Sequence, residues 1–209
     1  YWLVVQVDSA NAVAEDDGEA NNTFIAAQSI VVRSPDLRVN LLTSAATAVF
    51  GQSFAVNWGV TNSGNGPSLV PWSDRVWLSF ASNSLAGGTT LATVPAVGSP
   101  LATNASYTTN ATVTIPLNAQ SQPGIYWLIV QADAEGEQPE SNENNNLLSR
   151  LLTLTLPPLP DLSVTSVAGP ANALPGQLIA VSWSVTNRGS LSITGAWSET
   201  IFLATNSAG

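Results

Sequence analysis

The stretch YWLVVQVD at residues 1–8 returns as YWLIVQAD at residues 126–133, and this recurrence determines how the rest of the chain is interpreted. The same offset of 125 residues relates PDL at 35–37 to PDL at 160–162. Self-similarity at a fixed spacing is the sequence signature of a repeat architecture. The sequence therefore predicts a tandem repeat with a period of 125 residues.

The repeat divides the 209 residues into three parts. We predict the C-terminal part of one repeat at 1–35, a complete repeat at 36–160 and the N-terminal part of the next repeat at 161–209. The two outer parts together lack the region that corresponds to 85–125, so we expect that they cannot complete each other into a domain. The linker PPLP at 157–160 favours a short, stiff connection between neighbouring repeats.

Within the complete repeat, apolar residues follow the two-residue period of β-strands. The run FAVNWGV at 54–60 alternates apolar residues with small or polar ones, as do 76–80, 111–115 and 152–156. Turn-forming sequences such as NSGNGP at 62–67 separate these runs, and no window shows helical periodicity. Several short strands in a unit of this size predict an all-β fold of tandem immunoglobulin-like antiparallel β-sandwiches.

The composition excludes several classes of function. The chain carries a net charge of −9 and contains no Lys, His, Cys or Met. Without these residues it can form no Ser-His-Asp triad, ordinary zinc site, Schiff base or phosphate-binding P-loop. A pI near 4.1 argues against nucleic acid as a partner. No stretch of this segment reaches the length of an apolar membrane span. We therefore expect no enzyme here.

The order of several short motifs resembles the CARDB repeats. These motifs are PDL at 35–37, WSDR at 72–75, GIY at 124–126 followed by Asp133, and ESNENNN at 140–146. The resemblance implies immunoglobulin-like modules of large bacterial or archaeal surface or secreted proteins, with a role in cell adhesion. The first acidic loop departs from the pattern, because three residues separate its two glutamates and two residues separate Glu140 from Glu143.

Acidic residues are concentrated in two loops, which hold ten of the fourteen. In an immunoglobulin topology each such loop joins the last two strands, at the domain end that faces the preceding repeat. Clustered carboxylates favour a hard cation, and calcium takes six to eight oxygen ligands. The candidate calcium ligands are Asp36, Asp74, Asp133, Glu135, Glu137, Glu140, Glu143 and Asn145, with Asp8, Glu15, Asp17, Glu19 and Asn21 in the first loop. The alternative is a solvated acidic hairpin that keeps a Lys-free protein soluble.

The tryptophans fall into three groups. Trp58 and its counterpart Trp183 lie on the inward stripe of a predicted strand, which favours core packing for both. Trp72 and Trp197 lie near the acidic end and are candidates for packing at the domain end or at a junction. We expect Trp77, Trp127 and Ile129 to form an apolar outer patch, with Trp2 at an equivalent position. Such a patch favours a protein contact; the alternatives are cover by the 81–108 segment, a wrong strand parity, or a platform for sugar stacking.

These observations favour a non-catalytic extracellular or cell-surface protein, structural or adhesive, in which immunoglobulin-like domains form a stalk or fibre. Calcium at the joints is the candidate cofactor, and the expected partners are neighbouring repeats or other copies in an assembly. A chain without Cys or Met also suits an exposed protein that resists oxidation. The alternatives are an accessory module of a secreted enzyme and a carbohydrate-binding domain. A carboxylate-based glycosidase is disfavoured, because the paired acids lie in a loop with no evident cleft.

Overall fold

The computed structural model of the chain describes residues 1–16 and 19–205. Within these residues every extended element is a β-strand, and the only helical segment is the short 3₁₀ turn η1 (Glu19–Asn21). The all-β prediction is confirmed. No helix in the described residues is long and apolar enough to cross a membrane.

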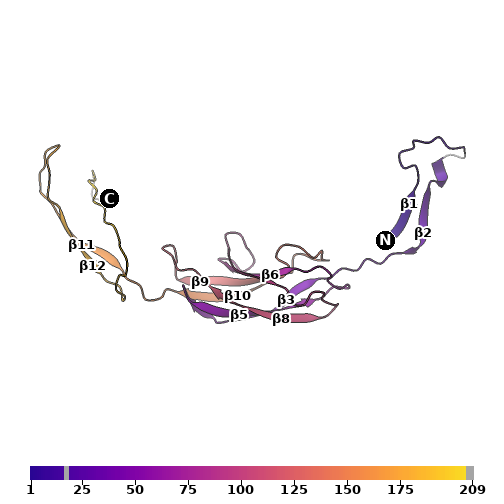
Figure 1. The fold of residues 1–209 in the computed structure, drawn as a ribbon, viewed down its shortest axis with the longest axis horizontal. Coiled ribbons are helices and arrows are strands. Elements are labelled where there is room, and N and C mark those ends of the chain that lie inside the picture. Colours follow the sequence, from indigo (N-terminus) through magenta and orange to yellow (C-terminus); the bar gives the residue numbers. More distant parts are fainter. Residues whose placement is uncertain (17–18, 206–209) are drawn as a thin grey trace.

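A β-sandwich of two sheets forms the centre of the molecule (Figure 1). The larger sheet has the order β4-β10-β9-β6-β7, and the smaller sheet has the order β3-β5-β8. The strands of the larger sheet are β4 (Thr47–Val49), β10 (Leu147–Thr155), β9 (Gly124–Gln131), β6 (Ser73–Ser79) and β7 (Thr89–Pro95). Those of the smaller sheet are β3 (Leu37–Ser44), β5 (Ser53–Asn62) and β8 (Ser106–Thr114). β7 and β8 are the last strands of their sheets, and they contact each other along one side of the sandwich.

One strand pair departs from the predicted antiparallel arrangement. β4 pairs with β10 in parallel, with Thr47 opposite Thr153 and Val49 opposite Thr155. β3 is in the smaller sheet and β4 in the larger one, and two residues separate them. The chain therefore switches sheets without reversing its direction, which places β4 parallel to β10 rather than antiparallel.

The core follows the alternation of the strands. Val56, Trp58 and Val60 of β5 are fully buried, as are Leu128 and Val130 of β9. The prediction that Trp58 packs in the core is confirmed. Inner side chains from both sheets form one core cluster, and this packing fixes which loops meet at each end of the domain.

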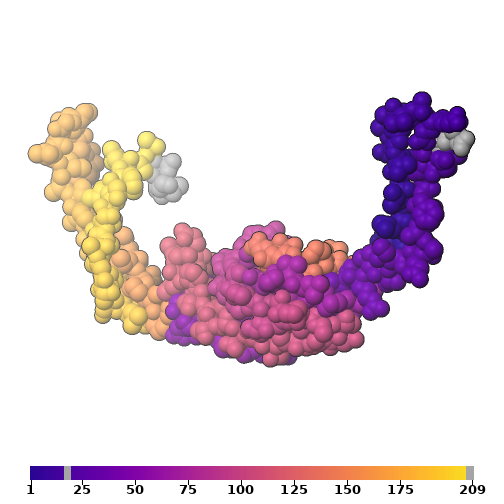
Figure 2. Space-filling view, turned by 45° about the vertical axis from the view of Figure 1, so that its right-hand side comes forward, coloured from indigo at the N-terminus to yellow at the C-terminus, as the bar shows by residue number. Residues whose placement is uncertain are grey.

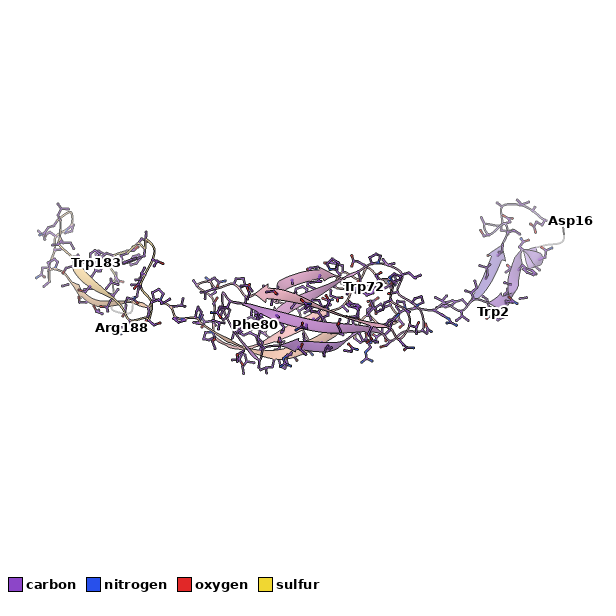
Figure 3. The ribbon with its side chains drawn as sticks, turned by 60° about the horizontal axis from the view of Figure 1, so that its bottom comes forward. Trp2, Asp16, Trp72, Phe80, Trp183 and Arg188 are labelled. Carbon is purple, nitrogen blue, oxygen red and sulfur yellow. The ribbon has the colours of Figure 1, made fainter. Side chains whose placement is uncertain are left out.

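A two-stranded hairpin lies beyond each end of the sandwich (Figures 1 and 2). The first consists of β1 (Trp2–Gln6) and β2 (Thr23–Ser29), and the second of β11 (Leu162–Ala168) and β12 (Ser182–Asn187). Figure 3 places Trp2 and Trp183 on these two hairpins and Trp72 within the sandwich. The apolar side chains of both hairpins are largely exposed.

Candidate metal site and domain joint

The loop between β9 and β10 brings three carboxylates together. One oxygen each from Asp133, Glu140 and Glu143 lies within 4.8 Å of the others. Asp133 has a positive φ of 46°, and its two carboxylate oxygens accept the backbone N–H groups of Glu137 and Gln138, both at 2.9 Å. These two hydrogen bonds close the start of the loop and aim the Asp133 carboxylate toward the other two acids.

Glu140 connects this loop to the first strand of the domain. One of its carboxylate oxygens accepts the backbone N–H of Leu37, and the other accepts the Asn146 side-chain amide at 2.8 Å. Burial raises the pKa of Glu140 to about 7, because desolvation disfavours the charged form more than these two hydrogen bonds stabilise it. The charge of Glu143 raises the pKa of Glu140 further, and burial also raises the pKa of Asp133.

Two asparagine side chains border the three acids. Asn146 is 5% exposed, and its amide oxygen has no hydrogen-bond partner among the residues that the structure describes. The amide oxygen of Asn145 is also buried without a hydrogen-bond partner among the described residues, while its NH₂ group donates to Asp36 at 2.9 Å. The loop thus holds two buried oxygen acceptors beside three carboxylates, all of them atoms that a hard cation prefers as ligands.

The linker before β3 is fastened to the same end of the sandwich. The side-chain oxygen of Asn62 accepts the N–H of Asp36 at 3.1 Å, and that of Asn65 accepts the N–H of Ser34 at 2.9 Å. The N–H of Ser141, in the acidic loop, donates to Pro35 O at 2.9 Å. The linker therefore contacts both the acidic loop and the turn after β5, and these contacts define the domain joint.

Two other predicted ligands of this loop are engaged elsewhere. Glu135 forms an ion pair with Arg75, and Glu137 accepts the N–H of Ser73 at 2.9 Å. Asp36 lies beside the cluster through its hydrogen bond from Asn145. The structure therefore brings Asp133, Glu140 and Glu143 together, with Asp36 and Asn145 adjacent, and places Glu135 and Glu137 over the start of β6.

The structure places Asp74 in the core, outside the group of three acids. Asp74 is fully buried, and one of its oxygens accepts the Trp58 Nε1–H at 2.7 Å and the Tyr107 hydroxyl at 2.5 Å. Burial raises its pKa, although both hydrogen bonds favour the ionised form. The reason is the strand boundary: β6 already begins at Ser73, so Asp74 points into the core instead of lying in a loop.

The first acidic loop resembles the second only in part. Asp8 has a positive φ of 42°, and its carboxylate accepts the N–H groups of Ala12 and Val13 at 2.8 and 2.9 Å. Glu15 and Asn21 are exposed. Asp17 and the Glu19 side chain lie outside the described residues. Within the described part of this loop, the structure shows no group of three acids like that of the second loop.

The predicted tryptophan contacts need two corrections. Trp72 is 2% exposed and packs with its ring centroid 6.1 Å from that of Tyr107, so it belongs to the core and not to an interface. Ile129 faces outward as its parity predicts, but it is fully buried. Trp77 lies directly opposite it on β6, and Trp127 precedes it by two residues on the same face. Ile129 therefore adds no exposed surface to the predicted patch, whereas Trp77 and Trp127 remain partly exposed.

The remaining tryptophans have different environments. Trp77 and Trp127 are half-buried, and the Arg75 guanidinium lies 5.2 Å from the Trp77 ring centroid. Trp2 and Trp197 are exposed, and the Trp197 indole N–H donates to Glu199 at 3.2 Å. Trp183 is 40% exposed, so the prediction that it packs in the core like Trp58 is wrong for this structure. The outer face of the larger sheet is therefore partly covered by its own side chains.

Sequence reasoning missed several polar residues that organise this end of the domain. Gln138 is buried, and its side-chain oxygen accepts the N–H groups of Leu69 and Val70 at 2.8 and 3.0 Å. Asn62 and Tyr107 were also missed. The recurrence of Asn62 as Asn187 was the signal available in the sequence, because an identical asparagine after equivalent strands indicates a shared turn.

Comparisons with known proteins give one family match. The CARDB family model matches residues 34–150. A crystal structure of a CARDB domain from Pyrococcus furiosus, described as a complex with di-metal ions, is 19% identical with a TM-score of 0.44, covering 61% of this chain and 95% of that one. The solution NMR structure of that domain is 20% identical with a TM-score of 0.43, covering 59% and 97%.

A structure of lower similarity is a β-glucosidase from Listeria innocua in complex with laminaribiose. It is 14% identical with a TM-score of 0.38, covering 59% of this chain and 16% of that one. The search of curated protein sequences gave no match.

Proposed function

Because the chain belongs to the CARDB family, whose model matches residues 34–150, we propose that it is a non-catalytic extracellular module of tandem immunoglobulin-like domains. In this proposal the domains form a structural or adhesive stalk. A calcium ion in the acidic loop stiffens the joint between the linker and the domain that follows it. The observation that carries the proposal is the group of Asp133, Glu140 and Glu143 beside the linker.

The chemistry of the acidic loop supports a cation. Three carboxylates within 4.8 Å repel one another when ionised, and a divalent cation between them removes this cost. Each carboxylate oxygen that already accepts an N–H keeps a second lone pair for a metal. The unpartnered amide oxygens of Asn145 and Asn146 add neutral donors. An all-oxygen donor set of this kind suits calcium better than zinc or copper.

The recurrence of whole contact patterns supports a tandem array. The Asn62 side-chain oxygen accepts the N–H groups of Asp36 and Gly64, and the Asn187 oxygen accepts those of Asp161 and Gly189. The hydrogen bond from the Trp58 indole to Asp74 has a counterpart from the Trp183 indole to Glu199. The Asp133 carboxylate accepts a backbone N–H four residues later, and the Asp8 carboxylate does the same. Each pair is related by the same offset of 125 residues.

The fastening of the linker supports a stiff connection. Backbone atoms of Ser34, Pro35 and Asp36 all bond to the sandwich. The turn after β5 also packs so closely on the linker that a Cβ at Gly64 would overlap the backbone of Ser34 and Pro35. Because each of these three linker residues is bonded to the sandwich, the linker has little freedom to bend, and a stalk requires this stiffness.

Thermal unfolding of the full chain with millimolar calcium and with chelator tests the proposal. A ligand that binds only the folded state stabilises it by RT ln(1 + [L]/Kd), about 2.7 kcal/mol at a hundredfold excess over Kd. We expect calcium to raise the Tm of the wild type. In the Glu143→Gln variant we expect this rise to be absent. The matched control is Glu135→Gln, which removes a charge from the same loop outside the group of three. A difference in Tm between calcium and chelator that is the same in all three proteins, or absent from all three, would contradict the proposal.

A further inference from the structure

We propose that the parallel pair of β4 and β10 is the element of the central sandwich that resists tension along the chain. This inference deepens the proposed stalk and rests on it, because a stalk of tandem domains transmits force from each domain to the next. It assigns a mechanical function to a strand pair at the opposite end of β10 from the candidate metal site.

The chain enters and leaves the sandwich at opposite ends (Figure 1). The linker at 34–36 is bonded to the end that holds the acidic loop. β10 begins after that loop and ends at Thr155, from which the linker at 157–160 continues away from the sandwich. Tension along the chain therefore pulls the start of β3 toward the acidic end and the end of β10 toward the other end.

The direction of β4 determines how this tension acts on it. β3 leads into β4 without a reversal of direction, and β4 lies parallel to β10. Pulling the domain by its two ends therefore slides β4 and β10 past each other along their own axes. The hydrogen bonds of a parallel pair are evenly spaced, so in this geometry they share the force and have to break together. Two strands that are pulled apart from one end lose their bonds one after another.

Hydrogen bonds and buried side chains hold the pair together. The N–H of Thr153 donates to Ala46 O at 3.0 Å. The N–H of Phe50 donates to Thr155 O, also at 3.0 Å. Phe50 and Leu154 are only 5% and 1% exposed. Sliding the strands apart therefore breaks these bonds and also exposes apolar side chains of the core to water.

The entering segment is also bonded to the loop directly before β10. Pro35 O accepts the N–H of Ser141 at 2.9 Å, and the Asp36 carboxylate accepts the Asn145 amide at 2.9 Å. The entering segment thus contacts both the loop that precedes β10 and the last residues of β10. The first contacts lie at a partly exposed loop, whereas the β4 pair is covered by the core. We therefore expect the main resistance at β4.

Single-molecule pulling in two directions tests the inference, since the chain contains no cysteine and handles attach at introduced ones. The full chain carries Arg33→Cys with Pro158→Cys, or Gln52→Cys with Pro158→Cys; these three positions are exposed. The first pair flanks the sandwich and loads β4 and β10 in shear. The second pair follows Val49 and Thr155, which lie opposite each other, so it peels the strands apart from that end. We expect the first direction to require roughly twice the unfolding force or more.

Two proline variants test whether β4 itself carries the force, with handles at Arg33→Cys and Pro158→Cys. Ala48→Pro removes a backbone donor from the middle of β4. Ala92→Pro is the matched control, because it makes the same substitution in β7, the opposite edge strand of the same sheet. Forced unfolding depends on the unfolding rate, whereas Tm reports equilibrium stability, so we measure both. We expect the unfolding force to fall by roughly half in Ala48→Pro and to stay at the wild-type value in Ala92→Pro, even where the Tm of both falls.

Equal unfolding forces in the two directions, or an equal loss of force in the two proline variants, would overturn the inference. The comparison of directions leaves β4 unchanged, so it decides the matter even where Ala48→Pro does not fold. All pulling is done in chelator, so a chain that binds no calcium still gives the expected difference. Equal forces in the two directions, in turn, leave the calcium-dependent shift in Tm unaffected, because that shift depends on the loop between β9 and β10.

Discussion

Glu140 accepts a hydrogen bond from the backbone N–H of Leu37, although 103 positions separate the two residues. Leu37 is the first residue of β3, directly after the linker, and Glu140 lies in the loop between β9 and β10. The contact therefore joins the point where the chain enters the domain to the loop that carries the acidic group. Any change in the charge of Glu140 acts on both the candidate metal site and the joint.

We expect Glu140→Gln to destabilise the domain by about 1–3 kcal/mol, the usual cost of leaving a buried donor without an acceptor. Glutamine has one acceptor oxygen, so its NH₂ group has to face either the Leu37 N–H or the Asn146 amide, both of which are donors. Urea unfolding measures the difference. Glu135→Gln is the matched control because its carboxylate pairs with Arg75 away from this contact, and an equal loss in both variants would refute the role of Glu140.

The metal-free protein should become less stable as the pH rises from about 4.5 to about 7. The folded-state pKa of Glu140 is about 7, above its ordinary value of 4.5, so in this range the folded protein binds a proton that the unfolded chain has released. Stability falls with rising pH wherever the folded state binds more protons. The pKa values of Asp133 and Asp74 are raised above their ordinary value of 3.8 as well, which gives the same sign as the pH rises above about 3.8.

Unfolding midpoints measured in chelator across this pH range check the prediction, with Glu140→Gln as the comparison. The variant should show a shallower slope, because it lacks the proton that the wild type releases near pH 7. In saturating calcium the wild-type slope should also decrease, since a bound cation keeps the carboxylates ionised. A metal-free wild type whose stability increases between pH 5 and 7 would contradict the expected sign.

The alternation of the strands was sufficient to predict the core but not the path of the chain at the domain edge. Val56, Trp58 and Val60 are buried as the two-residue period predicts. β4 has only three residues, too few for any period to be visible, and tertiary packing decides which sheet it joins. A switch between sheets of this kind depends on the space beside β10, which no local sequence pattern encodes.

The candidate site was predictable as a loop but not as a ligand set. Clustering of acids along the sequence identified the loop that holds Asp133, Glu140 and Glu143. Asp74 was added because an immunoglobulin topology places the loop before the third strand at the same end of the domain, but in the structure Asp74 lies within that strand. Its two hydrogen-bond donors, Trp58 and Tyr107, come from other strands and bond the same oxygen, so only the tertiary structure reveals how Asp74 is held inside the core.

Asp74→Ala should cost about 2–6 kcal/mol, because each of two buried donors left without an acceptor costs about 1–3 kcal/mol. Trp58 Nε1 and the Tyr107 hydroxyl are these donors. Asp74→Asn is the matched control: its side-chain oxygen still accepts from both groups, and we expect it to retain most of the stability. Urea unfolding compares the two variants.

Calcium titration of the folded Asp74→Asn variant separates this structural role from the metal-ligand role that the sequence suggested. We expect an affinity equal to that of the wild type, since Asp74 lies outside the group of three acids. A large loss of calcium affinity in this variant, together with normal stability, would return Asp74 to the ligand set.

Gly64→Ala should loosen the joint between the first hairpin and the sandwich. A Cβ at Gly64 would overlap the backbone of Ser34 and Pro35, and backbone cannot move aside as a flexible side chain does. We expect a loss of about 1–3 kcal/mol, typical of overpacking, and faster proteolysis of the linker. Gly195→Ala is the control, because no atom lies within 4 Å of the Cβ it would add. If the linker of Gly64→Ala resisted protease as well as that of Gly195→Ala, the close packing of the turn would not be what fixes the joint.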